Sequence, residues 1–158
     1  MKNRSPIKLL VILSSVLMLA SCQPAYVMWL VRGSTADNLV FGWSTTRGGV
    51  EKVQPEEIRV FPCATIGRQN GGGYYPDSHL AVWSASSYNA LPEPTNWLRY
   101  GQGFVQSSAK PLSSPGCYVV IAYARHGDIT AGATMGFKIE ANGVATEMPR
   151  DEYERLFR

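Results

Sequence analysis

Short apolar runs, each ended by glycine, proline, asparagine or serine, fill this chain of 158 residues from residue 25 onward. Long stretches with an apolar period of 3.6 residues are nearly absent, so the pattern predicts strands rather than helices. In the run at 38–44, Leu39, Phe41 and Trp43 alternate with smaller residues, which predicts a strand with one buried face. The expected strands are 25–33, 38–44, 57–63, 79–86, 96–101, 117–125 and 134–142.

The C-terminal part adds a hairpin and a helix. Asn142 and Gly143 suit the positive φ angles of a type I′ turn, after which residues 144–147 should return as a further strand. Residues 149–158 begin with proline and acidic residues and end with arginines, an order typical of a short helix. The whole pattern predicts a mostly β chain, namely an antiparallel two-layer β-sandwich, immunoglobulin-like or transthyretin-like, with a short C-terminal helix.

The start of the chain has the order of an export signal. Lys2, Arg4 and Lys8 precede an apolar run at 9–20. This run is about a dozen residues long, whereas a helix needs roughly 20 to cross a bilayer core. We therefore expect residues 1–21 to be a cleaved signal peptide.

The residues at the end of the apolar run suggest how the mature chain is attached to a membrane. Leu19, Ala20, Ser21 and Cys22 form the sequence LASC, which resembles the lipobox of bacterial lipoproteins. The resemblance implies cleavage before Cys22 and attachment of acyl chains, such as palmitate, to that cysteine, with residues 22–26 as a short tether. Several chains would anchor the protein firmly. An ordinary signal peptide with a cysteine nearby is the alternative.

The resemblance also suggests a location. Gln23 replaces the aspartate that retains enteric lipoproteins in the inner membrane. We therefore expect an envelope protein on the outer membrane, facing the periplasm, if the host is Gram-negative.

The net charge of the mature chain limits the classes of partner that it can bind, and its length indicates the number of domains. Loss of Lys2, Arg4 and Lys8 with the leader lowers 15 basic residues to 12, which matches the 12 acidic ones. A nucleic-acid partner is not expected, because such proteins keep a basic face. Removing 21 of 158 residues leaves 137, near the usual size of one domain, so residues 27–158 should form a single β-sandwich domain.

The remaining cysteines should form a disulfide. With Cys22 assigned to lipid, only Cys63 and Cys117 remain, in a compartment that we expect to be oxidising. Two buried free thiols are the alternative, and isolated cysteines do not form a close pair of zinc ligands. The bridge would join the bases of two long connections, at 64–78 and 106–116, which makes this edge a candidate binding region. The other interpretation is that both connections are solvent-exposed loops without a binding role, and that the disulfide only stabilises them.

Aromatic residues supply the candidate binding side chains. Tyr74 and Tyr75 follow three glycines in a loop, where exposed rings could stack on sugars or bind a protein. Trp83 and Trp97 are further candidates, whereas Trp29 lies in a strand-like run and is expected in the core together with Trp43. Packing of the loop against the domain is the alternative role of the two tyrosines.

Catalytic motifs are absent from the sequence: it has no GxSxG, HExxH, CxxC or phosphate-binding glycine motif. Asp77, Ser78 and His79 are adjacent, but a catalytic triad is defined by spatial geometry rather than by adjacency. His126 lies in a segment that is expected to be a turn. We therefore predict no catalytic residue, no bound metal and no cofactor.

Residues 98–120, LRYGQGFVQSSAKPLSSPGCYVV, resemble a segment of small exported β-sandwich lipoproteins of uncharacterised function. Together with the lipobox, this resemblance favours a membrane-anchored, non-enzymatic interaction or assembly accessory module with an envelope protein as partner. A glycan or peptidoglycan-binding module is the alternative. An envelope hydrolase with an unrecognised site is the third hypothesis.

Overall fold

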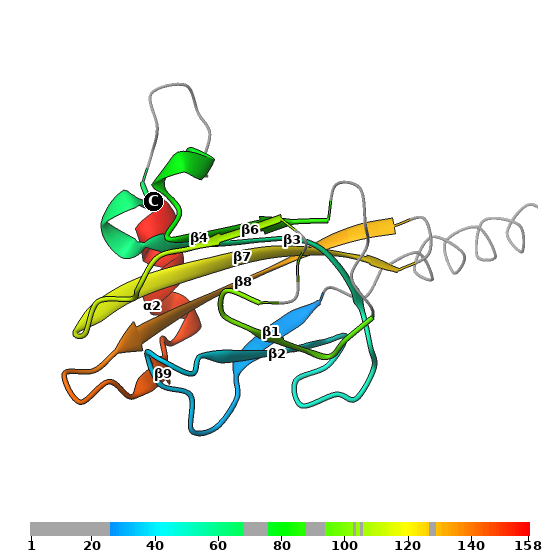
Figure 1. Cartoon of the computed structure of the whole chain (residues 1–158), viewed down its shortest axis with the longest axis horizontal. Helices are drawn as coiled ribbons and strands as arrows, with labels where there is room; N and C mark the ends of the chain where they lie inside the picture. Colours follow the sequence, from blue (N-terminus) through cyan, green and yellow to red (C-terminus); the bar gives the residue numbers. More distant parts are fainter. Residues whose placement is uncertain (1–25, 68–75, 88–93, 103, 105, 127–128) are drawn as a thin grey trace, which may run out of the picture.

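The computed structural model describes residues 26–67, 76–87, 94–102, 104, 106–126 and 129–158. Two antiparallel sheets pack face to face (Figure 1), as the sequence pattern predicts for a β-sandwich. The smaller sheet has the order β1-β2-β5. Its strands are β1 (Val27–Leu30), β2 (Val40–Ser44) and β5 (Trp97–Arg99).

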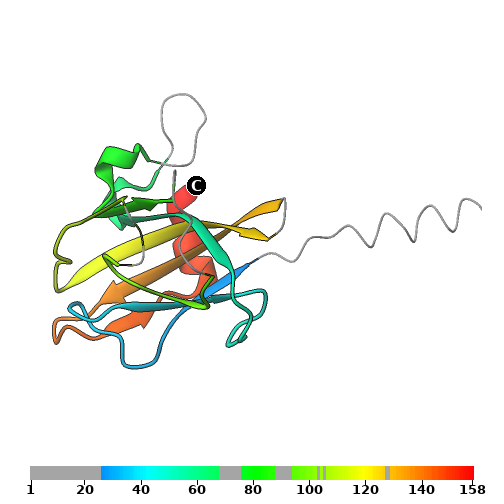
Figure 2. The same cartoon turned by 45° about the vertical axis from the view of Figure 1, so that its right-hand side comes forward.

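The larger sheet has six strands in the order β6-β4-β3-β7-β8-β9. Its two longest strands, β7 and β8, pair along their whole length and form a hairpin that spans the molecule (Figure 2). The strands are β3 (Gln54–Pro62), β4 (Trp83–Ser86), β6 (Gln106–Ala109), β7 (Gly116–His126), β8 (Ile129–Ile139) and β9 (Ala145–Glu147). The short helices are η1 (Cys63–Thr65), η2 (Ser78–Leu80), α2 (Arg150–Glu154) and η3 (Arg155–Phe157).

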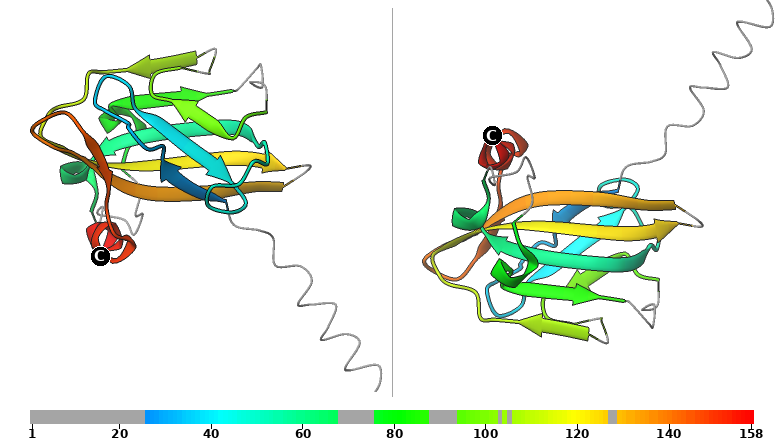
Figure 3. Two further views of the ribbon diagram at one scale, coloured as in Figure 1. Left: turned by 90° about the horizontal axis from the view of Figure 1, so that it is seen from below. Right: turned by 90° about the horizontal axis from the view of Figure 1, so that it is seen from above.

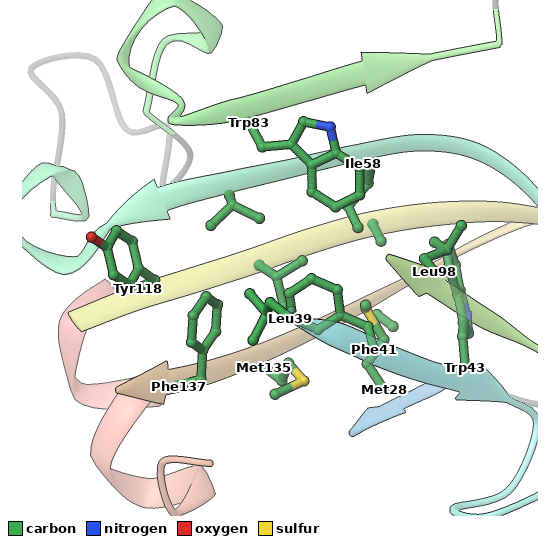
Figure 4. Close-up of a cluster of buried hydrophobic side chains, with 14 of the residues drawn as sticks. Met28, Leu39, Phe41, Trp43, Ile58, Trp83, Leu98, Tyr118, Met135 and Phe137 are labelled. Carbon is green, nitrogen blue, oxygen red and sulfur yellow. The ribbon is translucent and has the colours of Figure 1, made fainter. Parts of the chain in front are cut away.

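Large side chains from both sheets meet in the core between the layers (Figure 4). Phe41 of the smaller sheet is fully buried and stacks on Trp83 of the larger one, with ring centroids 6.4 Å apart. It also makes an edge-to-face contact with Phe137 at 5.7 Å. Alternation along each strand turns these residues inward, because successive side chains of a strand point to opposite faces.

A second, smaller apolar cluster covers part of the outer face of the larger sheet. Phe61, Val119 and Ile121 point away from the main core and pack against Leu156 and Phe157 of the C-terminal helical segment. That segment therefore has a structural role, since it covers apolar side chains that the sheet would otherwise expose.

A glycine in β8 lets the C-terminal segment approach this closely. A Cβ atom on Gly136 would lie 2.6 Å from Cβ of Tyr153. The Tyr153 hydroxyl donates a hydrogen bond to the carbonyl oxygen of Thr134 at 3.2 Å. Burial raises the pKa of Tyr153, so the neutral, donating form is favoured.

Strand β6 was not expected from the sequence, which predicted a loop over 106–116. It forms because its backbone pairs with β4, where Ser107 lies opposite Ala85 and Ser108 opposite Ser84. The indole nitrogen of Trp83 donates to Oγ of Ser107 at 2.9 Å. Tertiary pairing thus makes a strand from serines that carry little strand preference of their own.

The turn between β8 and β9 also differs from the prediction. Gly143 has a positive φ of 81°, but no non-glycine residue in the described chain does, so Asn142 does not adopt the type I′ conformation. The amide of Gly143 donates to the carbonyl of Glu140, and the amide of Glu140 donates to Val144, each at 2.8 Å. This pattern fits a longer hairpin loop that ends in a left-handed glycine.

Polar contacts join the two sheets along both sides of the sandwich. On one side, Glu147 of β9 accepts a hydrogen bond from the amide of Leu30 at 2.6 Å and pairs with Arg47 at 2.8 Å. On the other side, the Tyr100 hydroxyl, directly after β5, lies 2.8 Å from the carbonyl oxygen of Lys110 and 3.0 Å from that of Val82.

The strand directions give the sandwich two distinct ends. Val27, where β1 begins, pairs with Ser44, where β2 finishes, and the chain then crosses to the larger sheet at Gln54. At the opposite end Pro62 pairs with Tyr118. We call these the Tyr26 end and the disulfide end, the latter because Cys63 and Cys117 lie there.

Replacing Tyr100 by phenylalanine should lower the free energy of unfolding by about 1 to 2 kcal/mol, because it removes the hydrogen bond between the sheets. Burial, the largest cause, raises the pKa of Tyr100 above its ordinary value of 10.0. The fold therefore stabilises the neutral phenol, a contribution that is complete below about pH 10 and declines as the pH rises further. Chemical denaturation as a function of pH measures both effects. Equal stability of the two proteins at pH 7 would contradict the assignment.

Candidate functional site

The predicted disulfide is present. Cys63 and Cys117 are bonded with their Cα atoms 5.3 Å apart. It links the end of β3 to the start of β7, which are neighbours in one sheet, unlike the bridge between sheets in antibody domains. The bond therefore fixes the disulfide end of the larger sheet and the bases of both adjoining connections.

The four aromatic residues predicted to bind a ligand have different environments. Tyr74 and Tyr75 lie outside the described residues. The prediction for Trp83 is wrong, because its position in β4 turns the indole inward and leaves it 0% exposed. Trp97 is 55% exposed and is the only one of the four that the described structure presents to solvent.

A second tryptophan lies in the same cross-strand row as Trp97. Gly42 of β2 pairs with Trp29 of β1 on one side and with Trp97 of β5 on the other. A Cβ atom on Gly42 would lie 2.0 Å from Cε2 of Trp29, so the indole lies across this glycine. Trp29 was expected in the core, but alternation in β1 turns Met28 inward and Trp29 outward. The alternation of residues 26–30 was the signal that could have placed it.

The outer face of the three-stranded sheet is largely apolar. Trp97 and Val31, directly after β1, are 55% and 37% exposed, and Arg99 is the charged residue of the face. No described helix lies over this sheet (Figure 3). We call this surface the tryptophan face. The positions on this side of the sheet are Val27, Trp29, Val31, Val40, Gly42, Ser44, Trp97 and Arg99, of which Gly42 and Ser44 are buried.

The uncovered outer face of the larger sheet has a different composition, with serines and paired charges. Arg125 pairs with Glu56 at 2.5 Å, and Thr130 donates to the same carboxylate at 2.8 Å. Arg59 pairs with Glu57. This face meets water in the usual way for an antiparallel sheet, so the apolar character of the opposite face requires a separate explanation.

A groove of about 730 Å³ follows the free edge of β8. In the described chain β9 pairs with β8 only at Phe137–Ile139, and no other strand pairs with this edge between Ile129 and Gly136. The groove has Tyr26–Met28 on one side and α2 with Phe157 on the other. A strand edge that pairs with no described strand therefore lies between two walls.

Backbone groups of β8 face this groove. The carbonyl of Gly136 accepts from the Met148 amide at 2.9 Å, and the carbonyl of Thr134 accepts from Tyr153. Both groups point away from β7, and in an antiparallel ladder alternate residues share that direction. Gly132 and Thr130 therefore also direct their backbone groups toward the open edge.

The walls of the groove carry both apolar and charged side chains. Tyr26 and Met28 are buried at its base. Arg47 and Glu147 form an ion pair on one side, and Arg150 and Glu154 form another on the helix at 2.6 Å. Paired charges with exposed arginines can exchange partners with an incoming chain at little cost, since exposed ion pairs contribute little stability.

The side chains considered for catalysis form no catalytic arrangement in the described part of the chain. Nδ1 of His79 lies 4.0 Å from Oδ2 of Asp77, and both side chains are largely exposed. Ser78, between them, opens η2. No group of three or more histidine, cysteine, aspartate or glutamate side chains among the described residues could hold a metal ion.

Comparisons with known proteins find no matching protein family, no matching curated protein and no matching solved structure. In the described ranges, no helix is long and apolar enough to cross a membrane.

Replacing both Cys63 and Cys117 by alanine should lower the free energy of unfolding by about 4 kcal/mol, because the bond closes a 54-residue loop in the unfolded chain. Denaturant titration of the double variant measures this loss. Alkylation of the non-reduced, denatured protein should leave both cysteines unmodified, whereas the single variant Cys63→Ala should expose Cys117 to the reagent. Rapid alkylation of both residues in the unsubstituted protein would contradict the bond.

Proposed function

We propose that this protein is a lipid-anchored, non-enzymatic accessory module of a bacterial cell envelope that binds a partner protein by strand addition along β8. The observation that carries the proposal is the edge of β8 between Ile129 and Gly136, which pairs with no described strand and of which residues 132–136 line a groove. A free strand edge offers a row of backbone donors and acceptors to an extended chain.

The groove has the size and chemistry that such a partner needs. The unpaired part of β8 can accept a strand of about five or six residues, which is the usual length. Backbone pairing along Thr130 and Gly132, and with the amide of Thr134, whose carbonyl already accepts from Tyr153, would supply affinity. Alternate side chains of the added strand would meet the apolar base at Met28 and the arginine of the helix wall, Arg150, which would supply specificity.

The proposed cellular location of the protein rests mainly on features of the sequence. The lipobox-like segment that ends at Cys22 supports acylation, and the leader supports export. The Cys63–Cys117 bond fits an oxidising compartment. The periplasmic side of an outer membrane is the location that these features favour for a Gram-negative host.

Site-specific photo-crosslinking tests the groove. A photoreactive amino acid in place of Arg47, on the groove wall, should give a discrete adduct with one envelope protein in cells. The same substitution at Ser108, on the opposite edge strand β6, should give none. Adding Thr134→Arg, which places a long charged side chain in the groove, should lower the adduct at position 47 at least about tenfold, the equivalent of 1.4 kcal/mol of binding.

A matched variant separates the two edges of the larger sheet. Ser108→Arg introduces the same side chain at an exposed strand position outside the groove and should leave the adduct unchanged. Loss of the adduct with Ser108→Arg but not with Thr134→Arg would move the interface to β6 and contradict the proposal. Equal thermal stability of the two variants shows that the fold is intact in both.

The anchor has its own test. Cys22→Ser should abolish incorporation of labelled palmitate and release the protein from the membrane fraction, because the acyl acceptor is lost. Cys63→Ala, which retains Cys22, should remain labelled. Labelling of the Cys22→Ser protein would contradict the assignment of the lipid to this residue.

Glycan or peptidoglycan binding is the second candidate, and one observation favours it. Trp97 is exposed and lies in a row with Trp29, and tryptophan rings on a flat sheet can stack on sugars. Titration with cell-wall fragments should then change the tryptophan emission of the protein but not that of Trp97→Ser. An unchanged emission in both would contradict this candidate.

A further inference from the structure

We propose that the tryptophan face rests on the lipid bilayer, so that the protein lies on its three-stranded sheet instead of standing away from the membrane. This inference rests on the lipid anchor of the proposed function and adds an orientation and a second membrane contact. It is carried by the composition of the face, by its position next to the anchor and by the chemistry of its side chains.

The tryptophan face is more apolar than the solvent-exposed face of a typical antiparallel sheet. An antiparallel sandwich usually presents polar residues outward, as β3 and β4 do with Glu57, Arg59 and Ser84. On the tryptophan face the corresponding positions of β1 and β5 hold Trp29 and Trp97. A contiguous apolar surface of this kind marks a contact with another molecule or a membrane.

The length of chain between the anchor and the sheet limits which contact this is. Three residues separate Cys22 from Tyr26, and the four residue-to-residue steps between them reach at most about 14 Å when extended. β1 begins at Val27 and is itself part of the tryptophan face. An acylated Cys22 therefore keeps this face within a few side-chain lengths of the headgroups.

The side chains suit the interface between water and hydrocarbon. Tryptophan is enriched at that depth, because the ring is apolar and its N–H finds polar partners among the headgroups. Valines at 27, 31 and 40 surround the two indoles, and Arg99 at the rim suits the phosphates of anionic lipids. Among the eight outward positions there is no acidic residue to oppose this contact.

This orientation is compatible with binding along β8. Trp29 points to the tryptophan face, whereas Tyr26 and Met28 line the groove, so β1 lies between the two surfaces and Val27 borders both. The serine-rich outer face of the larger sheet then points away from the membrane. A partner would add its strand parallel to the bilayer surface.

The test uses the acylated protein purified from envelopes and reconstituted into vesicles of phosphatidylethanolamine and phosphatidylglycerol. Bromine on the acyl chains near the headgroups quenches tryptophans at that depth. We expect loss of about a quarter to a half of the emission relative to unbrominated vesicles, because two of the four tryptophans lie on this face. Trp97→Ser should lower the quenched component by half or more. Leu80→Ser removes a side chain with a similar exposure to Val31 and should leave it unchanged.

Flotation of the vesicles in the same experiment separates the possible failures. Protein that floats but is not quenched would overturn the orientation and leave the anchor intact. Protein that does not float would overturn both. A quenched component that is not reduced in Trp97→Ser would overturn the bilayer contact. A change in tryptophan emission on titration with cell-wall fragments, without bromine quenching, would also overturn it and would favour a glycan. If the bromine quenching is observed but no crosslinked adduct forms in the groove, the membrane orientation holds and the proposed protein partner does not.

Discussion

The contact between the two sheets through Phe41 is the interaction on which the rest of the structure depends. Its ring is fully buried between Trp83 and Phe137, which belong to different strands of the larger sheet. Burying a ring of this size contributes several times the thermal energy. Once this residue faces inward, the period of two fixes the direction of every other side chain in β2, so Leu39 and Trp43 join the core and Gly42 faces outward.

The outer surfaces are a consequence of the same alternation, and they differ from one another. One part of the larger sheet is covered by the C-terminal segment through Phe157, and another part meets water with paired charges such as Glu56 and Arg125. The three-stranded sheet has a largely apolar outer face that no described helix covers. The edge of β8 is open because β9 ends at Glu147, where the side chain turns back to bind Arg47 and the amide of Leu30. The two proposed binding surfaces are therefore the tryptophan face, which no described helix covers, and the edge of β8, part of which pairs with no described strand.

Several features could be predicted from particular residues. The alternation of Leu39, Phe41 and Trp43 predicted the buried face of β2, and two remaining cysteines predicted the bond between Cys63 and Cys117. These predictions succeeded because each depends on local periodicity or on a count. The predictions for Trp83 and Trp29 were wrong for a related reason. Alternation divides the side chains of a strand between two faces, but in a short run it does not indicate which face packs against the other sheet. The groove was not predicted, because it is formed by β1, β8 and α2, which are far apart in the chain.

The sequence by itself determined the strand-rich class, the helical end and the pairing of the cysteines, since these follow from side-chain alternation, helix-end residues and cysteine number. The tertiary structure decided which strands are neighbours, that Ser107 and Ser108 form an edge strand, and that Trp29 and Trp97 lie in one row across Gly42. The physical reason is that strand neighbours are chosen by contacts between distant segments, whose energies depend on both partners, while a local pattern contains only one of them.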